Sequence, residues 1–354
     1  MYPSSKIIKV LVVDDSIFFR KVLIDNLSKM DNIEVIGYAI NAFDAKKKIP
    51  LLNPDVITMD VEMPGLNGIE FLKQLIPQNP IPVILVSSLN ISVFEALSAG
   101  AVDFVRKPDA SQGNNIQNFM SDLGRKIHIA SNAKVRVPSQ AQQVRKTSAR
   151  QTPHGLLGPS AKLDGTIIAL GASTGGTEAT LSVLKELPAD TPGMVIVQHM
   201  PPGFTKMYAD RLDRLCSMTV KEAKNGDKIV RGQALIAPGD MQMKVVKIGA
   251  QYSVSCFDGE KVSGHKPSVD VLFNSMADSV KTNGIGIILT GMGRDGAAGI
   301  CRMRQNGAYT IGQNKESCVV YGMPMVAYEM GGVCTQASCE NIPNILMQKL
   351  RSMK

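Results

Sequence analysis

Three residues in the second half of the sequence could together perform nucleophilic catalysis. Ser173 stands in the motif GASTGG, His199 in QHMP and Asp295 in TGMGRDG, and each motif directly follows a short apolar run. A serine hydroxyl needs a general base to act as a nucleophile, and a carboxylate commonly orients a histidine base. The sequence therefore predicts nucleophilic catalysis with Ser173 as nucleophile, His199 as base and Asp295 as the orienting acid.

The glycine-rich turn around Ser173 has a second interpretation. Such a turn between a strand and a helix can bind the phosphates of a dinucleotide, and the next strand then ends in an acidic residue. Here the next apolar run ends in Gln198-His199, which disfavours a nucleotide-dependent oxidoreductase without excluding it. The order Ser, His, Asp also differs from that of α/β-hydrolases. The remaining histidines lie outside strand ends and are weaker candidates for the base: His128, His154 and, in a loop rich in Gly and Lys, His265.

Acidic side chains and one lysine follow the apolar runs of the first half. Asp14 and Asp15 come after the first run, Asp60 after the third, Ser87 at the end of the fourth and Lys107 just past the fifth. Three carboxylates at one edge of a sheet repel one another unless a cation lies between them, and oxygen-only ligands suit Mg²⁺. Lys107 and Ser87 can bind phosphoryl oxygens. The set predicts a magnesium site that also holds a phosphoryl group.

Short apolar runs alternate with amphipathic segments along most of the chain. In the first half we expect strands at Lys9–Val13, Glu34–Ala39, Val56–Met59, Val83–Val86 and Asp103–Val105. In the second half we expect them at Thr166–Leu170, Met194–Val197, Ala234–Ile236 and Ile285–Leu289, with an antiparallel hairpin over Lys244–Ile248 and Tyr252–Phe257. This alternation predicts an α/β fold with two doubly wound parallel sheets.

The net charge of +8 is concentrated in one segment. Residues 125–163 contain eight Lys and Arg and no Asp or Glu, and much of this segment is rich in Ser, Gln, Ala and Pro. Because no aromatic residues lie among the charges, the composition favours a flexible linker over a nucleic-acid-binding segment. We expect a first domain over 1–127, a basic linker over 128–163 and a second domain over 164–354. A DNA-binding regulator remains an alternative, and it requires a helix-turn-helix or basic helix after the linker.

The sequence also bears on where the protein acts. No apolar run approaches the length of a membrane helix, and the first run contains Lys9 and ends in acids, unlike a signal peptide. We therefore expect a cytoplasmic protein without membrane insertion. All six cysteines lie in the second half and none form a C-x-x-C pair, so we expect neither a disulfide framework nor a zinc site.

Five motifs of the first half resemble those of response-regulator receiver domains: VVDDS, TMDVEMPGLNG, LVSS, GAVDF and FVRKP. The resemblance spans about residues 6–127 and implies a flavodoxin-like domain in which a histidine kinase phosphorylates Asp60. It assigns Mg²⁺ to Asp14, Asp15, Asp60 and the carbonyl of Glu62. It also implies that Ser87, Phe104 and Lys107 are switch residues and that the Lys107–Pro108 bond is cis.

Six motifs of the second half resemble the catalytic domain of the chemotaxis protein-glutamate methylesterases, the CheB family: GASTGG, VQHMP, IAPG, HKPSVDVLF, LTGMGRDGA and YGMP. The resemblance spans about residues 165–350 and implies a Rossmann-like, three-layer α/β/α hydrolase that needs no cofactor. Its expected reaction removes methyl groups from glutamate methyl esters on chemotaxis receptors and releases methanol, and some members also deamidate receptor glutamines. Carried over by motif, Ser173, His199 and Asp295 are catalytic, and the backbone N–H groups of Thr174 and Met292 form the oxyanion hole.

Overall fold

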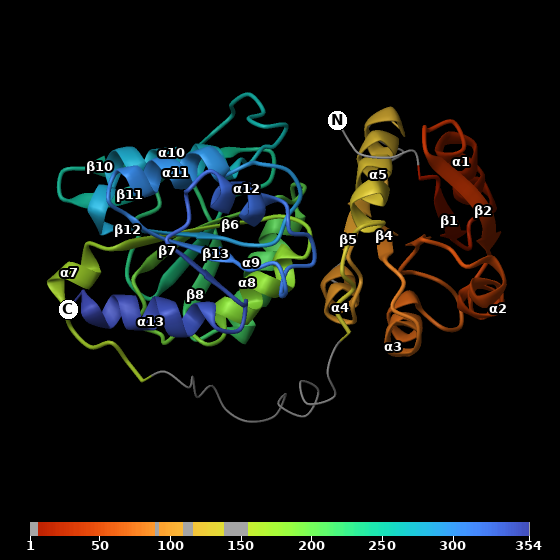
Figure 1. The fold of residues 1–354 in the computed structure, drawn as a ribbon, viewed down its shortest axis with the longest axis horizontal. Helices are drawn as coiled ribbons and strands as arrows, with labels where there is room; N and C mark the ends of the chain where they lie inside the picture. The colour runs from red at the N-terminus through yellow and green to blue at the C-terminus, as the bar shows by residue number, and fades with distance from the viewer. Residues whose placement is uncertain (1–5, 89–91, 109–115, 138–154, 354) are drawn as a thin grey trace. The chain divides into compact units, whose positions relative to one another are not determined.

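The computed structural model describes residues 6–88, 92–108, 116–137 and 155–353. The chain divides into two compact units, Met1–Lys146 and Thr147–Lys354. Figure 1 colours the first unit from red to yellow and the second from green to blue. Each unit has its own parallel sheet, so the predicted α/β fold class is confirmed.

The sheet of the first unit has five parallel strands in the order β2-β1-β3-β4-β5. The strands are β1 (Ile8–Val13), β2 (Ile33–Ala39), β3 (Val56–Met59), β4 (Val83–Ser87) and β5 (Asp103–Arg106). The helices are α1 (Ile17–Leu27), α2 (Ala42–Leu52), α3 (Gly68–Gln78), α4 (Ser92–Ser98) and α5 (Ile116–Ala130). Helices α1 and α5 pack on one face, and α2, α3 and α4 form a row on the other. Because both faces are covered, every residue of the central strands β3 and β4 is buried.

Short polar side chains begin the first three helices. Ser16, Asn41 and Asn67 each accept a hydrogen bond from a backbone N–H three residues further along the chain, which satisfies a donor that the helix leaves unpaired. Each cap lies in the loop that joins the carboxyl end of a strand to a helix. The caps therefore fix where each helix begins, and so fix the loops at the edge of the sheet that carries Asp14 and Asp60.

The sheet of the second unit has seven parallel strands in the order β14-β13-β12-β6-β7-β9-β8. Four of them coincide with predicted strands: β6 (Ile167–Ala172), β7 (Gly193–Gln198), β9 (Gln233–Ile236) and β12 (Gly284–Ile288). Three were not predicted: β8 (Thr219–Glu222), β13 (Tyr309–Gln313) and β14 (Thr335–Ala337). The predicted hairpin is present as β10 (Gln242–Ile248) and β11 (Gln251–Phe257), which pair antiparallel.

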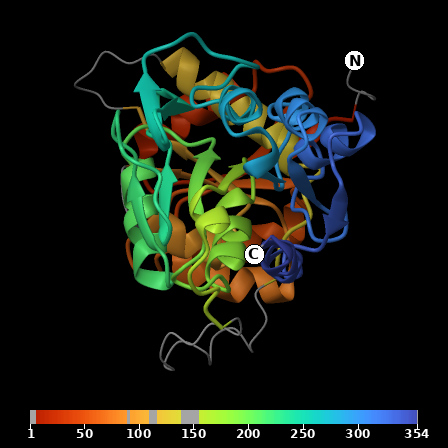
Figure 2. The same ribbon diagram turned by 90° about the vertical axis from the view of Figure 1, so that its left-hand side faces the viewer.

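Helices cover both faces of the seven-stranded sheet, as Figures 1 and 2 show. Helices α10 (Val269–Ser279), α11 (Ala297–Gln305) and α12 (Met323–Glu329) pack on one face, where the hairpin adds to their layer by contacting α10. On the other face lie α8 (Gly176–Leu184), α9 (Phe204–Leu215) and α13 (Ile342–Ser352). Two short helices, α7 (Ala161–Asp164) and the 3₁₀ helix η3 (Lys281–Asn283), complete the unit. The expected three layers are therefore present.

Both ends of the expected linker are more ordered than its composition predicts. Helix α5 continues to Ala130. At the other end Leu157 is buried, and the N–H groups of Leu157 and Gly158 donate to the carboxylate of Asp190 at 2.9 and 2.7 Å. Residues 138–154, the middle of the expected linker, lie outside the described residues.

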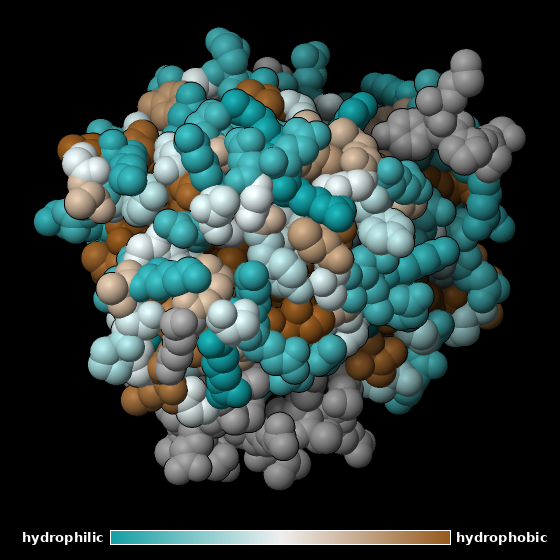
Figure 3. Space-filling model, turned by 60° about the vertical axis from the view of Figure 1, so that its left-hand side comes forward, coloured by the Kyte–Doolittle hydropathy of each residue, from teal (hydrophilic) through white to brown (hydrophobic). Residues whose placement is uncertain are grey.

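The hydropathy of the exposed residues can be followed on one face of the molecule (Figure 3). On the face shown in Figure 3, hydrophilic residues predominate and hydrophobic ones are scattered. Among the described residues, no helix combines the length and the apolar character needed to cross a bilayer.

Candidate active site

Three neighbouring strands end side by side at the carboxyl edge of the seven-stranded sheet. Ser173 is the first residue after β6, and its N–H donates to the carbonyl of Thr290, just past β12, at 3.0 Å. His199 is the first residue after β7, and its N–H donates to the carbonyl of Ala172 at 3.1 Å. Because these backbone bonds continue the strand pairing, Ser173 lies between the other two strand ends.

Glycine at position 291 makes room for Ser173. A Cβ atom at Gly291 would lie 2.7 Å from the Cβ of Ser173, closer than real Cβ contacts allow. The Ser173 carbonyl accepts hydrogen bonds from Gly176 N–H at 2.7 Å and from the Gln198 side-chain amide at 2.9 Å. The turn that carries Ser173 is thus held from β7 and from the start of α8.

His199 and Asp295 meet although 96 positions separate them. Nε2 of His199 lies 2.8 Å from Oδ2 of Asp295. An ionised carboxylate only accepts hydrogen bonds, so Nε2 carries the proton and Nδ1 keeps a free lone pair. Nδ1 is buried and has no hydrogen-bond partner among the described residues. Asp295 thus binds the imidazole through the ring nitrogen opposite to the one that the aspartate binds in chymotrypsin-type triads.

The carboxylate of Asp295 is held at the beginning of α10. It accepts hydrogen bonds from the Ser268 hydroxyl at 2.7 Å and from the N–H groups of Val269 and Asp270 at 2.7 and 3.1 Å. Burial tends to raise the pKa of Asp295, but the hydrogen bonds from His199, Ser268 and Val269 and the electrostatic attraction of His199 outweigh burial, so its pKa is lowered. Asp295 therefore stays ionised while it is only 1% exposed.

The two residues expected to supply the oxyanion hole flank this site. The buried Thr174 follows Ser173, and its carbonyl accepts from the Thr290 hydroxyl at 3.0 Å. Met292 follows Gly291, and its N–H donates to no described residue. The Ser173 hydroxyl likewise makes no hydrogen bond with the described part of the chain. Catalytic hydrogen bonds are often long without substrate, so the roles of these residues stay predictions.

One residue of this site was passed over by the sequence reasoning. The ring of His265 stacks on the ring of His199, with centroids 3.7 Å apart and planes 9° from parallel. Its loop between the hairpin and α10 contains no strand end, which is why its position gave no signal. The available clue was its place at the start of HKPSVDVLF, one of the six motifs that carry the resemblance described above.

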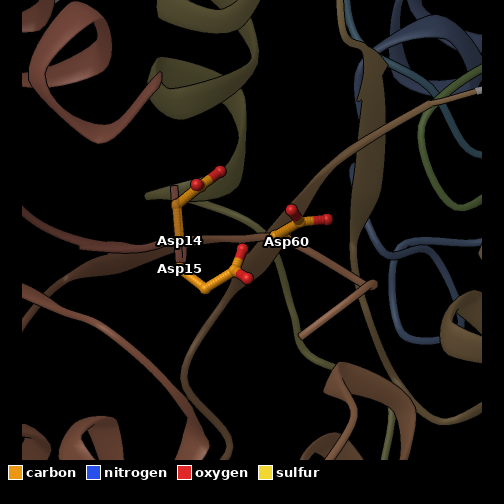
Figure 4. Close-up of side chains that lie close together, drawn as sticks. All are labelled: Asp14, Asp15 and Asp60. Atoms are coloured by element: carbon orange, nitrogen blue, oxygen red, sulfur yellow. The ribbon is translucent and has the colours of Figure 1, made fainter. Parts of the chain in front are cut away.

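The acids of the first unit gather as the sequence predicts. Ligand oxygens of Asp14, Asp15 and Asp60 all lie within 4.8 Å of one another, at the ends of the neighbouring strands β1 and β3 (Figure 4). The Lys107 ammonium lies 3.0 Å from Asp14 and 2.6 Å from Asp60. Oxygen-only donors in this arrangement fit a divalent cation.

The charges of this acidic site influence each other's titration. Burial raises the pKa of Asp60, and the nearby charge of Asp14 adds to this rise, while Lys107 only partly opposes it. Burial lowers the pKa of Lys107, but the hydrogen bonds and charges of Asp60 and Asp14 outweigh it, so its pKa is raised. Lys107 therefore stays cationic beside the carboxylates.

The remaining residues predicted for the first unit lie after β3, on β4 and on β5. The backbone N–H of Glu62 donates to Asp60 at 3.0 Å. Ser87 is fully buried with no partner for its hydroxyl among the described residues, and Phe104 is buried at 3% exposure. The predicted cis bond at Lys107–Pro108 is wrong: in the described residues only Lys266–Pro267 is cis. The Lys107–Pro108 bond is therefore trans, and with this bond trans the Lys107 ammonium lies close to the carboxylates of both Asp14 and Asp60.

Comparisons with known proteins give a consistent result over both units. A family model described as CheB methylesterase matches residues 168–346, and one described as response regulator receiver domain matches residues 10–115. A Syntrophomonas wolfei protein named protein-glutamate methylesterase/protein-glutamine glutaminase 2 is 49% identical over 346 residues, which are 98% of each chain. An Escherichia coli K12 protein named protein-glutamate methylesterase/protein-glutamine glutaminase is 43% identical over 347 residues, which are 97% of each chain.

A solved structure is similar to the second unit. The crystal structure of the Thermotoga maritima CheB methylesterase catalytic domain matches 52% of this chain and 98% of that chain. The TM-score is 0.51, and the matched residues are 36% identical.

Proposed function

The chain belongs to the CheB methylesterase family and carries a receiver domain, and we propose how its own residues perform and control this chemistry. It is a protein-glutamate methylesterase and protein-glutamine glutaminase of bacterial chemotaxis, controlled by phosphorylation. Chemoreceptors are its substrates, and a kinase is its partner. The alternatives of a DNA-binding regulator and a nucleotide-dependent oxidoreductase are therefore wrong.

In the proposed mechanism Ser173 Oγ attacks the γ-carbonyl carbon of a methylated glutamate while His199 Nδ1 takes its proton. The tetrahedral intermediate collapses, the C–O bond to the methoxy group breaks, and the same proton leaves with methanol. Water then attacks the acyl carbon while His199 Nδ1 takes a proton from it. The bond between that carbon and Ser173 Oγ breaks, the proton passes from Nδ1 to Oγ, and the released glutamate carries the new carboxylate after losing a proton to solvent. A glutamine side chain offers the same carbonyl, with ammonia as leaving group.

The observation that carries this proposal is the hydrogen-bonded pair of His199 and Asp295 beside Ser173. The pair leaves Nδ1 buried, unpaired and at the strand edge that carries the serine. We propose that the backbone N–H groups of Thr174 and Met292 stabilise the oxyanion, because both flank the same turn. Together these groups supply a nucleophile, a base and charge stabilisation.

Asp295→Asn should reduce methanol release from methylated receptor membranes strongly, yet about 10- to 100-fold less than loss of Ser173 does. Activity falls because the neutral amide of asparagine cannot replace the charged carboxylate that accepts from His199 Nε2–H. The loss is smaller than for Ser173 because the residue at position 295 forms no bond to the substrate. Single-turnover and steady-state rates at saturating substrate would measure the difference. Activity close to that of the unaltered enzyme in a folded Asp295→Asn protein would contradict the proposed role.

We propose that Asp60 is the phosphorylated residue and that Mg²⁺ is the cation of the acidic site. Asp14, Asp15 and Asp60 would hold the ion with the carbonyl of Glu62, because their oxygens already converge. The ion would neutralise phosphoryl oxygens during transfer. Lys107 is placed to bind a phosphoryl oxygen on Asp60, and the buried Ser87 hydroxyl has a free donor for another.

Removal of divalent cations should abolish phosphorylation by small phosphodonors such as acetyl phosphate. Without a cation, the carboxylates of the acidic site repel the incoming phosphoryl oxygens. Phosphoprotein formed in excess EDTA should fall to background, and Mg²⁺ should restore it. Undiminished labelling in EDTA would contradict a metal-dependent site.

We propose that the unphosphorylated receiver domain restrains the hydrolase and that phosphorylation relieves the restraint. Added charge at Asp60 can change how Ser87 and Phe104 pack, and thereby the receiver surface. The catalytic strand ends must admit a receptor helix, so a domain docked over them would exclude substrate. The crystallised catalytic domain of the Thermotoga maritima relative suggests that the hydrolase folds alone.

Deletion of residues 1–150 should therefore raise basal methanol release and remove its response to phosphodonors. The measurement compares the truncated enzyme, the full chain and the full chain with phosphodonor on the same membranes. If the truncated enzyme is no faster than the unphosphorylated full chain, restraint by the receiver is excluded and the receiver acts mainly as an activator.

We further propose that the protein works in the cytoplasm with a histidine kinase of the chemotaxis pathway and methyl-accepting receptors. None of the six cysteines, all of which lie in the described residues, forms a disulfide, which fits a reducing compartment. Fractionation of cells with a membrane and a periplasmic marker would test this placement.

A further inference from the structure

The loop between the hairpin and α10 presents His265 flat against His199. The two rings are 3.7 Å apart and nearly parallel. One face of the His199 imidazole is therefore covered by a second planar ring. Two rings in contact at this distance attract each other through dispersion and leave each other little room to tilt, so the contact favours a single orientation of both planes.

Gln242 fixes this loop at both of its ends. Its side-chain N–H₂ donates to the carbonyls of Glu260 and His265 at 2.9 and 3.2 Å, and its side-chain oxygen accepts from Ser268 N–H at 2.9 Å. Gln242 itself is buried, with 1% exposure. A buried amide with three partners holds its bonded groups in a defined geometry.

Lys266 adds a second attachment next to His265. Its ammonium lies 3.2 Å from a carboxylate oxygen of Asp240 and 2.8 Å from one of Asp258. Both acids lie outside α10, so the lysine joins the loop to the β9–β10 connection and to the residue that follows β11. The backbone on either side of His265 is therefore held independently of the contact with His199.

The same loop leads into the residues that hold Asp295. Ser268, Val269 and Asp270 all donate to that carboxylate. Asp295 binds Nε2 of His199 in the plane of the ring, and His265 lies against the face of the ring. The hydrogen bond to Asp295 thus limits rotation within the plane of the imidazole, and the contact with His265 limits tilting of that plane. Together they fix the direction in which the Nδ1 lone pair points.

We propose that His265 is a positioning residue for the methylesterase reaction: its ring fixes the plane of His199 so that Nδ1 stays aligned with the nucleophile. This inference rests on the proposed roles of Ser173 and His199. His265 acts through His199, so it affects the rate of the chemical step and leaves substrate affinity nearly unchanged. Small misplacements of a reacting group reduce rates substantially.

Two substitutions in the full-length enzyme separate stacking from other roles. His265→Ala removes the ring, and kcat for methanol release should fall roughly 10- to 100-fold with little change in KM. His265→Phe keeps a planar ring without nitrogen atoms and should restore most of kcat. Lys261→Ala, in the same loop and exposed, is the matched control and should leave both constants unchanged.

The hydrogen bond between His199 and Asp295 provides a readout independent of turnover. Its Nε2 proton should give a downfield NMR resonance that is sharp in the unaltered and His265→Phe proteins. The resonance should broaden or disappear in His265→Ala because the ring is no longer held. Thermal unfolding of each variant shows whether the loop change has destabilised the fold.

Three outcomes would overturn the inference. These are full kcat in His265→Ala, equal losses in His265→Ala and His265→Phe, or an unchanged Nε2 resonance in His265→Ala. Loss of activity in Ser173→Ala together with full activity in His265→Ala would leave the proposed function intact and remove only the role of His265. Retained activity in Ser173→Ala would contradict the proposed function itself.

Discussion

Ser173→Ala should abolish methanol release, with a loss of about 10⁴-fold or more relative to the unaltered enzyme. In the proposed mechanism, Ser173 carries the hydroxyl that the hydrogen-bonded pair of His199 and Asp295 activates. Without it, no acyl-enzyme forms, and only slow attack by water on a bound ester remains. The measurement is methanol release from methylated receptor membranes at saturating substrate.

The fold should tolerate this change because alanine fills less space than serine and the Ser173 hydroxyl makes no hydrogen bond in the described part of the chain. Ser182→Ala is the matched control, since Ser182 lies on α8, the helix that follows the same turn. Circular dichroism should be the same for both variants. A folded Ser173→Ala enzyme that keeps a tenth of the activity would disprove the assignment of the nucleophile.

Asp60→Asn should abolish phosphorylation of the receiver domain by acetyl phosphate in Mg²⁺. An amide cannot accept a phosphoryl group as an acyl phosphate, and it removes one charge from the acidic site. The label on the unaltered protein should be released by mild base, as expected for an acyl phosphate. Mass spectrometry of the intact protein measures its presence directly.

The matched control is Asp55→Asn, because Asp55 and Asp60 flank opposite ends of the same strand, β3. The Asp55 carboxylate binds Lys6 and the N–H of Lys9. Its replacement by an amide removes one negative charge next to β3, as Asp60→Asn does, and so tests whether the loss of charge alone prevents phosphorylation. The control should label normally. Label that persists in Asp60→Asn would refute this residue as the phosphorylation site.

The short apolar runs that form the strands made most of both folds predictable from the sequence. All nine strands predicted for the two parallel sheets are present, because strands buried on both faces consist of continuous apolar residues. The missed strands carry weaker signals. Strands β8 (TVKE) and β14 (TQA) are short and polar because they lie at the two edges of the sheet, and β13 (YTIGQ) contains a glycine.

The residues of the candidate sites were predictable from the sequence where they directly follow a strand. Ser173, His199 and the three aspartates of the receiver unit follow strands, so their approximate location came from topology alone. His265 did not, because its position depends on the hydrogen bonds of Gln242 and on the ion pairs of Lys266. Such long-range contacts leave no periodic pattern in the sequence. The same holds for the hydrogen bond between Leu157 N–H and Asp190, which gives the end of the expected linker a defined structure.

The strand order of the second unit determines when the enzyme can first become active during its synthesis. Strand β6, which carries Ser173, is central, and its partners on its two sides are β7 and β12. Ile167 pairs with Gly284, so one side of β6 stays unpaired until the ribosome has made β12, more than a hundred positions later in the sequence. A nascent chain that ends before Asp295 has its serine and its histidine but lacks the carboxylate, and the open edge of β6 is exposed to other chains. Catalytic competence and protection from aggregation should therefore arise together, late in translation.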